Sequence, residues 1–213
     1  MFSINIATHS IISTGSYIVH FYHGESIRSV FYEALPYIEV VTDLLNRNLM
    51  DSFPRVSPVK FLREQKNLDD GRIIDNTNLW KGGAFLLFDG NNIIGASLAR
   101  EEIIIDKFGN RNRTGRGFGL FAVVDIEYRN GIWGILLSGI AIDSLIQKGC
   151  NLVRGSTSIY NIPVDKLFSR FARTRWVEGE WIRYVVDTEK FSVLFYKLLE
   201  SKGLKEQYNL IFL

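Results

Sequence analysis

The chain has 213 residues, with a hydrophobic fraction of 46%, a charged fraction of 23% and a formal net charge of +2 at pH 7. These values exclude a disordered or fibrous chain, and a charge this close to neutral does not call for nucleic acid or a membrane surface as partner. The length fits one domain, 1–213, and is short for two.

The cysteine content and the amino terminus indicate the compartment. Cys150 is the single cysteine, which excludes an intrachain disulfide and fits a reducing environment. It follows Gly149 at the start of an apolar strand, so we expect a buried structural thiol. The first basic residue is Arg28, which does not fit a secretory signal, and no apolar run reaches the roughly 20 residues of a membrane-spanning helix. We expect a cytoplasmic, soluble protein.

The first part of the chain mixes strand, helix and irregular patterns. The expected elements are strands over 3–7 and 16–22, a helix over 25–50 with a break or fresh start at Pro36, and an irregular stretch over 51–81 with a short helix over 59–65.

Three antiparallel strands are expected next. The turn signal Asp89-Gly90-Asn91 separates apolar runs over 83–88 and 92–106 and predicts a hairpin. The basic, glycine-rich stretch 107–117 predicts a second turn, which returns the chain into a strand over 118–126.

The last part of the chain alternates helical and extended patterns. The expected elements are a helix over 135–146, a strand over 150–160, a short helix over 164–173, an extended stretch over 174–187, an amphipathic helix over 189–201 and a strand over 209–213.

The transition from the strand over 120–126 to the following helix carries the main functional signal. Its turn contains Arg129, Gly131 and Gly134. The first N–H groups of a helix have no intrahelical partner and carry partial positive charge, so a diphosphate binds there through the main chain. The alternative is a tight strand-to-helix connection in which the glycines serve packing.

This turn resembles the pyrophosphate loop of the GNAT superfamily of acyl-CoA-dependent N-acetyltransferases, Gln/Arg-x-x-Gly-x-Gly/Ala after Val-x-Pro-x-x-Arg. Val124, Arg129 and Gly134 fall on matching positions. Ile126 stands where proline is usual, and Ile132 where the middle glycine is usual.

A second GNAT landmark follows, Asn-x-x-Ala-x-x-Leu-Tyr-x-x-x-Gly-Phe. Asn161 and Leu167 match it, Phe168 replaces the tyrosine, and Ala172-Arg173 replaces Gly-Phe. The resemblance extends over about 83–184.

The resemblance implies a fold of the α/β (α+β) class. We expect a mixed, mostly antiparallel central sheet with helices on both faces, in which the strands flanking the phosphate-loop helix run parallel and splay apart. The best-matched core is 83–184, and 51–81 is expected to be an insertion beside the acceptor site.

The cofactor implied by the resemblance is acetyl-CoA or another acyl-CoA. Its pantetheine arm is expected on the backbone of the strand before the loop, where amides around Val124 stabilise developing negative charge. The expected cofactor-binding residues are Val123, Val124, Ile126, Arg129, Asn130, Gly131, Ile132, Trp133, Gly134, Ile135, Asn161 and Phe168. The alternatives are a plain core strand for the valines and ordinary turn chemistry for Asn161.

The proton donor is the main departure from the family. Phenylalanine at Phe168 cannot protonate the departing thiolate, as the usual tyrosine does. Tyr160 and Ser169 are the nearest replacements. The alternatives are that the thiolate departs unaided or that the chain is not an active transferase.

The candidate general bases are strand carboxylates. They are Glu101, Glu102 and Asp125, and the alternative for each is a solvated carboxylate. We expect Glu101 and Asp125, with Tyr160, to form the catalytic set.

Other charged groups suggest weaker roles. The histidines, His9, His20 and His23, lack metal-ligand spacing, so we expect no metal site. The basic stretch 107–117 suggests an acidic or nucleic-acid contact, with a solvated turn as the favoured alternative. The arginines at 170, 173 and 175 are expected near the terminal phosphate of the cofactor.

Taken together, the sequence predicts an acyltransferase that moves an acyl group to a primary amine by direct attack in a ternary complex. The acceptor is a small molecule or a protein, no membrane is involved, and the chain is a monomer or homodimer. The alternatives are an inactive acyl-CoA-binding module and, less favoured, a nucleic-acid-modifying protein on the same scaffold.

Overall fold

The computed structural model describes residues 18–23, 26–31, 38–49, 66–67, 73–74, 84–89, 92–129, 131–205 and 208. The helices are α1 (Ile38–Leu49), α4 (Trp133–Gln147), α5 (Ile162–Phe168) and α6 (Thr188–Ser201), with the 3₁₀ turn η2 (Ile126–Tyr128). The strands are β1 (Ile18–His23), β2 (Ser26–Phe31), β3 (Lys66–Asn67), β4 (Ile73–Ile74), β5 (Ala84–Asp89), β6 (Asn92–Ile105), β7 (Arg111–Val124), β8 (Leu152–Ser158), β9 (Ala172–Glu178) and β10 (Trp181–Val186).

The strands form one mixed sheet in the order β1-β2-β5-β6-β7-β8-β10-β9, with β4 paired to β6 and β3 to β4. The pairing of β7 with β8 is parallel, and the other described pairings are antiparallel. Parallel neighbours need a crossover connection, which α4 supplies here. The predicted mixed, mostly antiparallel sheet is confirmed.

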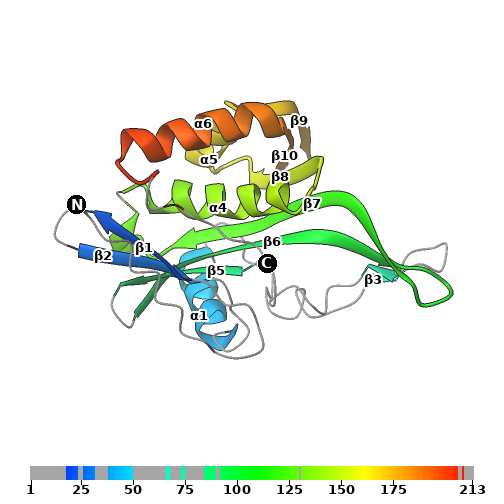
Figure 1. Cartoon of the computed structure of the whole chain (residues 1–213), viewed down its shortest axis with the longest axis horizontal. Coiled ribbons are helices and arrows are strands. Elements are labelled where there is room, and N and C mark those ends of the chain that lie inside the picture. Colours follow the sequence, from blue (N-terminus) through cyan, green and yellow to red (C-terminus); the bar gives the residue numbers. More distant parts are fainter. Residues whose placement is uncertain are drawn as a thin grey trace.

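Helices cover both faces of the sheet, as predicted. In Figure 1, α1 lies below the sheet, α4 lies above it, and α6 stacks on the outer side of α4. On α1, Val41, Leu44 and Leu45 have helical spacing and are buried. Because α4 is enclosed between the sheet and α6, it is buried around most of its circumference, which explains its almost uniformly apolar sequence.

Two glycines allow α4 to approach its neighbours closely. A Cβ atom on Gly117 of β7 would lie 2.8 Å from Cδ1 of Leu145, and one on Gly139 of α4 would lie 2.2 Å from Cε2 of Phe195. These contacts fix the helix against the strand that precedes it and against α6.

The turn predicted over 107–117 is wrong for most of its length. Strand β7 already begins at Arg111, and the turn spans 106–110, where the Asp106 carboxylate accepts bonds from the backbone and side chain of Asn110. Pairing along β6 overrode the turn-like composition, and a long two-stranded hairpin extends from the sheet (Figure 1).

The helix predicted over 25–50 is wrong in its first part. Residues 26–31 form β2, and α1 begins at Ile38. Because β2 is paired with β1 on one side and β5 on the other, the partner strands decided its conformation.

The carboxyl-terminal elements follow the prediction with shifted ends. The helix expected over 164–173 is the shorter α5, and the stretch over 174–187 is the hairpin of β9 and β10. Cys150 is buried, and burial raises the pKa of its thiol to about 11, so the predicted buried thiol is confirmed.

Several predicted elements lie outside the described residues. They are the strands over 3–7 and 209–213 and the helix over 59–65. Across the described parts of the chain, no helix has both the length and the apolar character that crossing a membrane requires.

Candidate functional site

Strands β7 and β8 pair over a short segment, in the middle of β7 and at the amino end of β8. The parallel register joins residues 116–118 of β7 to 152–154 of β8. Beyond them, β7 continues to Val124 and β8 to Ser158 without pairing to each other. The predicted splay is therefore confirmed. Carboxyl ends of neighbouring parallel strands border one opening, which is where open α/β sheets bind ligands.

The register of β7 on β6 determines which backbone groups face this splay. Val124 lies opposite Gly95, and the N–H of Asp125 donates to the carbonyl of Ile94 at 2.8 Å. In an antiparallel ladder this makes Val124 and Gly95 a non-hydrogen-bonded pair. The N–H and C=O groups of Val124 and Ala122 therefore point away from β6, toward the splay.

The two predicted valines thus differ in position. Val123 lies opposite Ala96, and the same alternation commits its N–H and C=O to the ladder with β6. The Val124 side chain is buried in the core with α4, while its backbone borders the splay. Val124 therefore combines a core side chain with an N–H that is not paired to β6, while its carbonyl accepts from Nε of Arg129.

Strand β8 borders the splay on the other side. Ser158 lies opposite Trp181, and the N–H of Ile159 donates to the carbonyl of Glu180 at 3.0 Å. The same alternation turns the N–H groups of Ser158 and Ser156 and the C=O of Ser156 away from β10, toward the splay, while the C=O of Ser158 accepts from the N–H of Asn161 at 3.0 Å. Both walls of the opening therefore present main-chain donors and acceptors.

Asn161 lies at the carboxyl end of this wall. Its side chain does not cap α5 and makes no hydrogen bond within the described part of the chain, while its carbonyl accepts from the N–H of Asp165 at 3.0 Å. Tyr160, the residue before it, is 75% exposed. Both side chains are available to a ligand at the opening.

Helix α4 begins without a side-chain cap. Its N-cap residue, Ile132, has no side-chain acceptor, and the N–H groups of Gly131, Ile132, Gly134 and Ile135 find no acceptor among the described residues. Gly131 and Ile135 are exposed. The uncapped start of α4, with its partial positive charge, follows the end of β7 after η2 and a short turn.

The glycines of this turn provide space. Neither Gly131 nor Gly134 has φ in the left-handed region, so the turn does not need them for its backbone conformation. A Cβ atom on Gly131 would lie 3.2 Å from Cδ1 of the buried Trp133, whereas the nearest atom to one on Gly134 is Cγ2 of Val124 at 3.8 Å. Gly131 makes room for the indole, whereas at Gly134 an added Cβ atom would make only an ordinary van der Waals contact.

Arg129 reaches back from the turn. Its Nε donates to the carbonyl of Val124 at 3.1 Å, and its Nη2 donates to both oxygens of Asn48 at 3.0 Å. Ile126 opens η2 and is 67% exposed. Asn130 lies outside the described residues. The guanidinium thus holds the turn against α1, and its predicted phosphate contact stays a prediction.

No family model matches the chain, and no curated protein matches it. Its structure is similar to the GNAT domain of S. lividans PAT, with a TM-score of 0.53 and 12% identity over 80% of this chain and 95% of that chain. It is also similar to Arabidopsis thaliana NAA60, whose crystal structure is a complex with acetyl-CoA, with a TM-score of 0.50 and 14% identity over 75% of this chain and 97% of that chain. The chain has the GNAT fold.

Within this GNAT fold, Phe168 is part of an aromatic cluster. Its ring centroid lies 5.2 Å from that of Phe171 and 5.3 Å from that of Tyr184. Its Cε1 atom would lie 3.3 Å from a Cβ atom on Gly155 of β8. The ring therefore packs on the strand that forms one wall of the splay.

The Asp165 carboxylate anchors α5 to the sheet. It accepts two bonds from Arg175, at 2.9 and 3.0 Å, and one from the Tyr184 hydroxyl at 2.6 Å. Arg175, and after it Tyr184, lowers the pKa of Asp165 to about 2, while burial and then Asp165 raise the pKa of Tyr184. This cluster holds the helix that carries Asn161 and Phe168.

The predicted carboxylate bases all face arginines. Glu101 accepts from Arg113 at 2.5 and 2.8 Å, and Arg113 also donates to the carbonyl of Lys148, just after the carboxyl end of α4. Glu102 is 7% exposed and lies 3.6 Å from Arg116. The structure does not bring Glu101 to the open end of the splay between β7 and β8.

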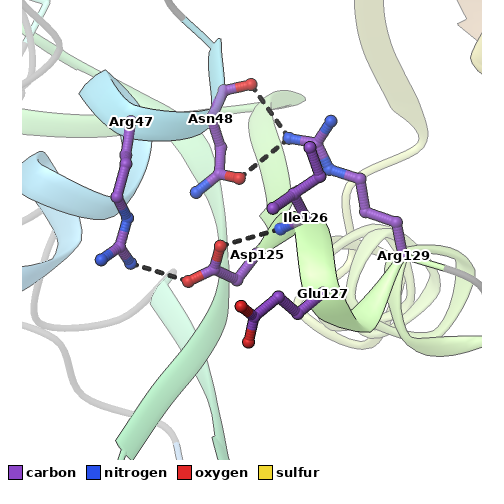
Figure 2. Close-up of a pocket in the computed structure, with 6 residues that line it drawn as sticks. All are labelled: Arg47, Asn48, Asp125, Ile126, Glu127 and Arg129. Carbon is purple, nitrogen blue, oxygen red and sulfur yellow. Dashed lines mark hydrogen bonds and ion pairs between the residues drawn. The ribbon is translucent and has the colours of Figure 1, made fainter.

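Asp125 lies on the α1 side of the sheet. Its Oδ2 accepts from Arg47 at 2.7 Å, and its Oδ1 accepts from the N–H of Ile126 (Figure 2). These residues, with Asn48, Glu127 and Arg129, line a cavity of about 380 Å³. Asp125 therefore borders a groove between α1 and η2.

The sequence analysis missed three groups that the structure places at openings. They are the backbones of Ser156 and Ser158, and the side chain of Glu127. The residues facing the splay follow from strand register, which was not known from the sequence. Glu127 had no signal beyond its place in the turn, because Arg47 and Asn48, which complete its groove, are about 80 residues away in the chain.

Proposed function

We propose that this chain transfers an acetyl or other acyl group from acyl-CoA to a primary amine, by direct attack in a ternary complex. The observation that carries the proposal is the juxtaposition of the splay with the uncapped start of α4 at the end of one strand, β7. The β7 wall of the splay offers main-chain hydrogen-bonding groups to a ligand, and the start of α4 offers N–H groups to an anion.

The described residues fit acyl-CoA. The N–H groups of Gly131, Ile132, Gly134 and Ile135 have no acceptor in the described structure, which is the donor set that a diphosphate requires. The edge at Ala122 and Val124 would hold the pantetheine arm. Acyl-CoA supplies the activated acyl thioester.

The residues of this chain would act by positioning and electrostatics. The N–H of Val124 faces the splay and would stabilise negative charge on the acyl oxygen during attack. Tyr160 would donate a proton to the departing thiolate. Because the carboxylates of Glu101, Glu102 and Asp125 each face an arginine, we assign removal of the amine proton to solvent.

Gly134 gives the sharpest test of the cradle. Gly134→Asp places a negative charge at the start of α4, where it favours the helix but repels a diphosphate, and Gly134→Asn is the matched neutral variant. At this position the Cβ atom of either variant would lie 3.8 Å from its nearest neighbour, an ordinary contact. By calorimetry, we expect the Asp variant to bind CoA at least about tenfold more weakly than the Asn variant. Equal affinities, or no CoA binding by the unaltered protein, would overturn the proposal.

A second candidate function is an acyl-CoA-binding module without turnover, which Phe168 at the usual tyrosine position favours. Incubation of acetyl-CoA with a panel of amines separates the two. Release of free thiol that depends on the amine supports the transferase, whereas CoA binding without thiol release supports the module.

A further inference from the structure

The groove between α1 and η2 runs along the α1 face of the sheet. Two adjoining cavities, of about 380 and 470 Å³, share Arg47, Asp125 and Glu127 in their walls and are together called the groove. Its walls also carry apolar surface, because Val40 is 49% exposed and Ile126 is 67% exposed. The groove is large enough for a small ligand or a short segment of peptide.

Among the described residues, one charged side chain of this groove has no partner. Arg47 is paired with Asp125, and Arg129 donates to Asn48 and Val124. The carboxylate of Glu127 makes no hydrogen bond or ion pair with the described residues, and Figure 2 shows it beside Asp125 without a contact. Glu127 is therefore the carboxylate of the groove that the described residues leave without a cationic partner.

The groove and the splay border the same strand end. Asp125, which lines the groove, directly follows Val124, whose backbone borders the splay. Arg129 bonds to both regions, through Asn48 on the groove side and Val124 on the splay side. A ligand in the groove thus lies next to the strand on which the proposed reaction takes place.

We propose that this groove binds the acceptor of the acyl transfer, and that Glu127 pairs with a second cationic group on that acceptor. The acceptor class is a primary amine joined by an aliphatic chain to an ammonium or guanidinium group. A diamine and a peptide with a basic side chain share this chemistry. This inference rests on the proposed function, because it takes the groove ligand to be the acceptor.

Calorimetry with three probes tests the inference without turnover. The probes are a linear aliphatic diamine, a monoamine of the same chain length and a lysine-containing dipeptide amide. The proteins are the unaltered chain, Glu127→Gln, and Glu189→Gln as a control, because Glu189 is an exposed carboxylate on α6, outside the groove. Since Glu127 has no described partner, its variant should fold, which a thermal melt checks.

We expect the unaltered protein to bind the diamine or the dipeptide about tenfold more tightly than the monoamine, and the difference to weaken with salt. Glu127→Gln should remove this preference, and Glu189→Gln should keep it. The tighter of the two cationic probes identifies the acceptor source. Equal affinity for diamine, dipeptide and monoamine, or a preference that survives Glu127→Gln, would overturn the inference.

The CoA measurements on Gly134 variants distinguish the two proposals. Loss of Glu127-dependent binding with intact CoA binding rejects the groove assignment alone. Glu127-dependent binding in a protein that binds no CoA rejects the transferase and keeps a cation-binding groove.

Discussion

The guanidinium of Arg129 donates from Nη2 to the backbone and side-chain carbonyl oxygens of Asn48, each at 3.0 Å, across 81 residues of sequence. Its Nε donates to the carbonyl of Val124 at 3.1 Å. One side chain therefore fastens the carboxyl end of α1 to the end of β7, and so joins the groove to the splay.

Replacing this arginine by lysine tests the connection. The ammonium group of lysine in Arg129→Lys cannot reproduce the geometry in which the planar guanidinium donates to three acceptors at once. We expect the free energy of unfolding, measured in urea, to fall by about 1–2 kcal/mol. The control is Arg170→Lys, because Arg170 is exposed and its side chain makes no hydrogen bond or ion pair with the described residues. An equal loss in both variants would contradict the assignment.

The buried Asp143 predicts a pH dependence of stability. It is 1% exposed on α4, and its Oδ2 accepts from the hydroxyls of Tyr208 at 2.8 Å and Tyr196 at 3.4 Å. Burial raises the pKa of Asp143 above its ordinary value of about 4. At pH values between the pKa of the unfolded state and the raised pKa of the folded state, the folded protein therefore keeps a proton on Asp143 that the unfolded chain has lost. This contribution to stability is full below about pH 4 and is lost as the pH rises through the raised pKa.

Asp143→Asn should remove that dependence, because asparagine has the same size and no charge. Relative to the variant, the unaltered protein should lose about 1.4 kcal/mol for each unit by which the pKa is raised. Urea unfolding between about pH 4 and pH 8 measures the difference. Parallel curves for the two proteins would show that Asp143 does not titrate in the folded state.

The opposite dependence is expected for Asp165. Its pKa is lowered to about 2, chiefly by Arg175, so its stabilising contribution is present above about pH 4 and is lost as the pH falls toward 2. Asp165→Asn should be less stable than the unaltered protein at pH 7 and should approach it in acid. It should also weaken CoA binding, because α5 carries Asn161. A constant difference in stability from pH 7 to pH 2 would argue against the charged form.

Gly139 should tolerate no side chain. A Cβ atom there would lie 2.2 Å from Cε2 and 2.6 Å from Cδ2 of Phe195. Gly139→Ala should therefore lower the free energy of unfolding by about 1–3 kcal/mol, despite the better helix propensity of alanine. Gly134→Ala is the matched control on the same helix, because its nearest contact would be 3.8 Å away. Destabilisation by both variants alike would exclude the contact with Phe195 as the cause.

Local patterns in the sequence determined much of the fold. The Asp89-Gly90-Asn91 sequence predicted the hairpin of β5 and β6, and the apolar run after Gly134 predicted α4. The strand-turn-helix order with Val124 and Arg129 pointed to the GNAT fold, which the structure confirms. Turn residues and helical periodicity act over a few neighbouring residues, so the sequence displays them directly.

Contacts between distant residues decided the rest. Residues 26–31 became β2 because partner strands were available on both sides. The edge that Val124 presents to the splay depends on its register with Gly95, and the groove around Glu127 exists because Arg47 meets Asp125 from 78 residues away. Strand register and charge pairing are set by the assembled sheet and helices, so the sequence alone carried no signal for them.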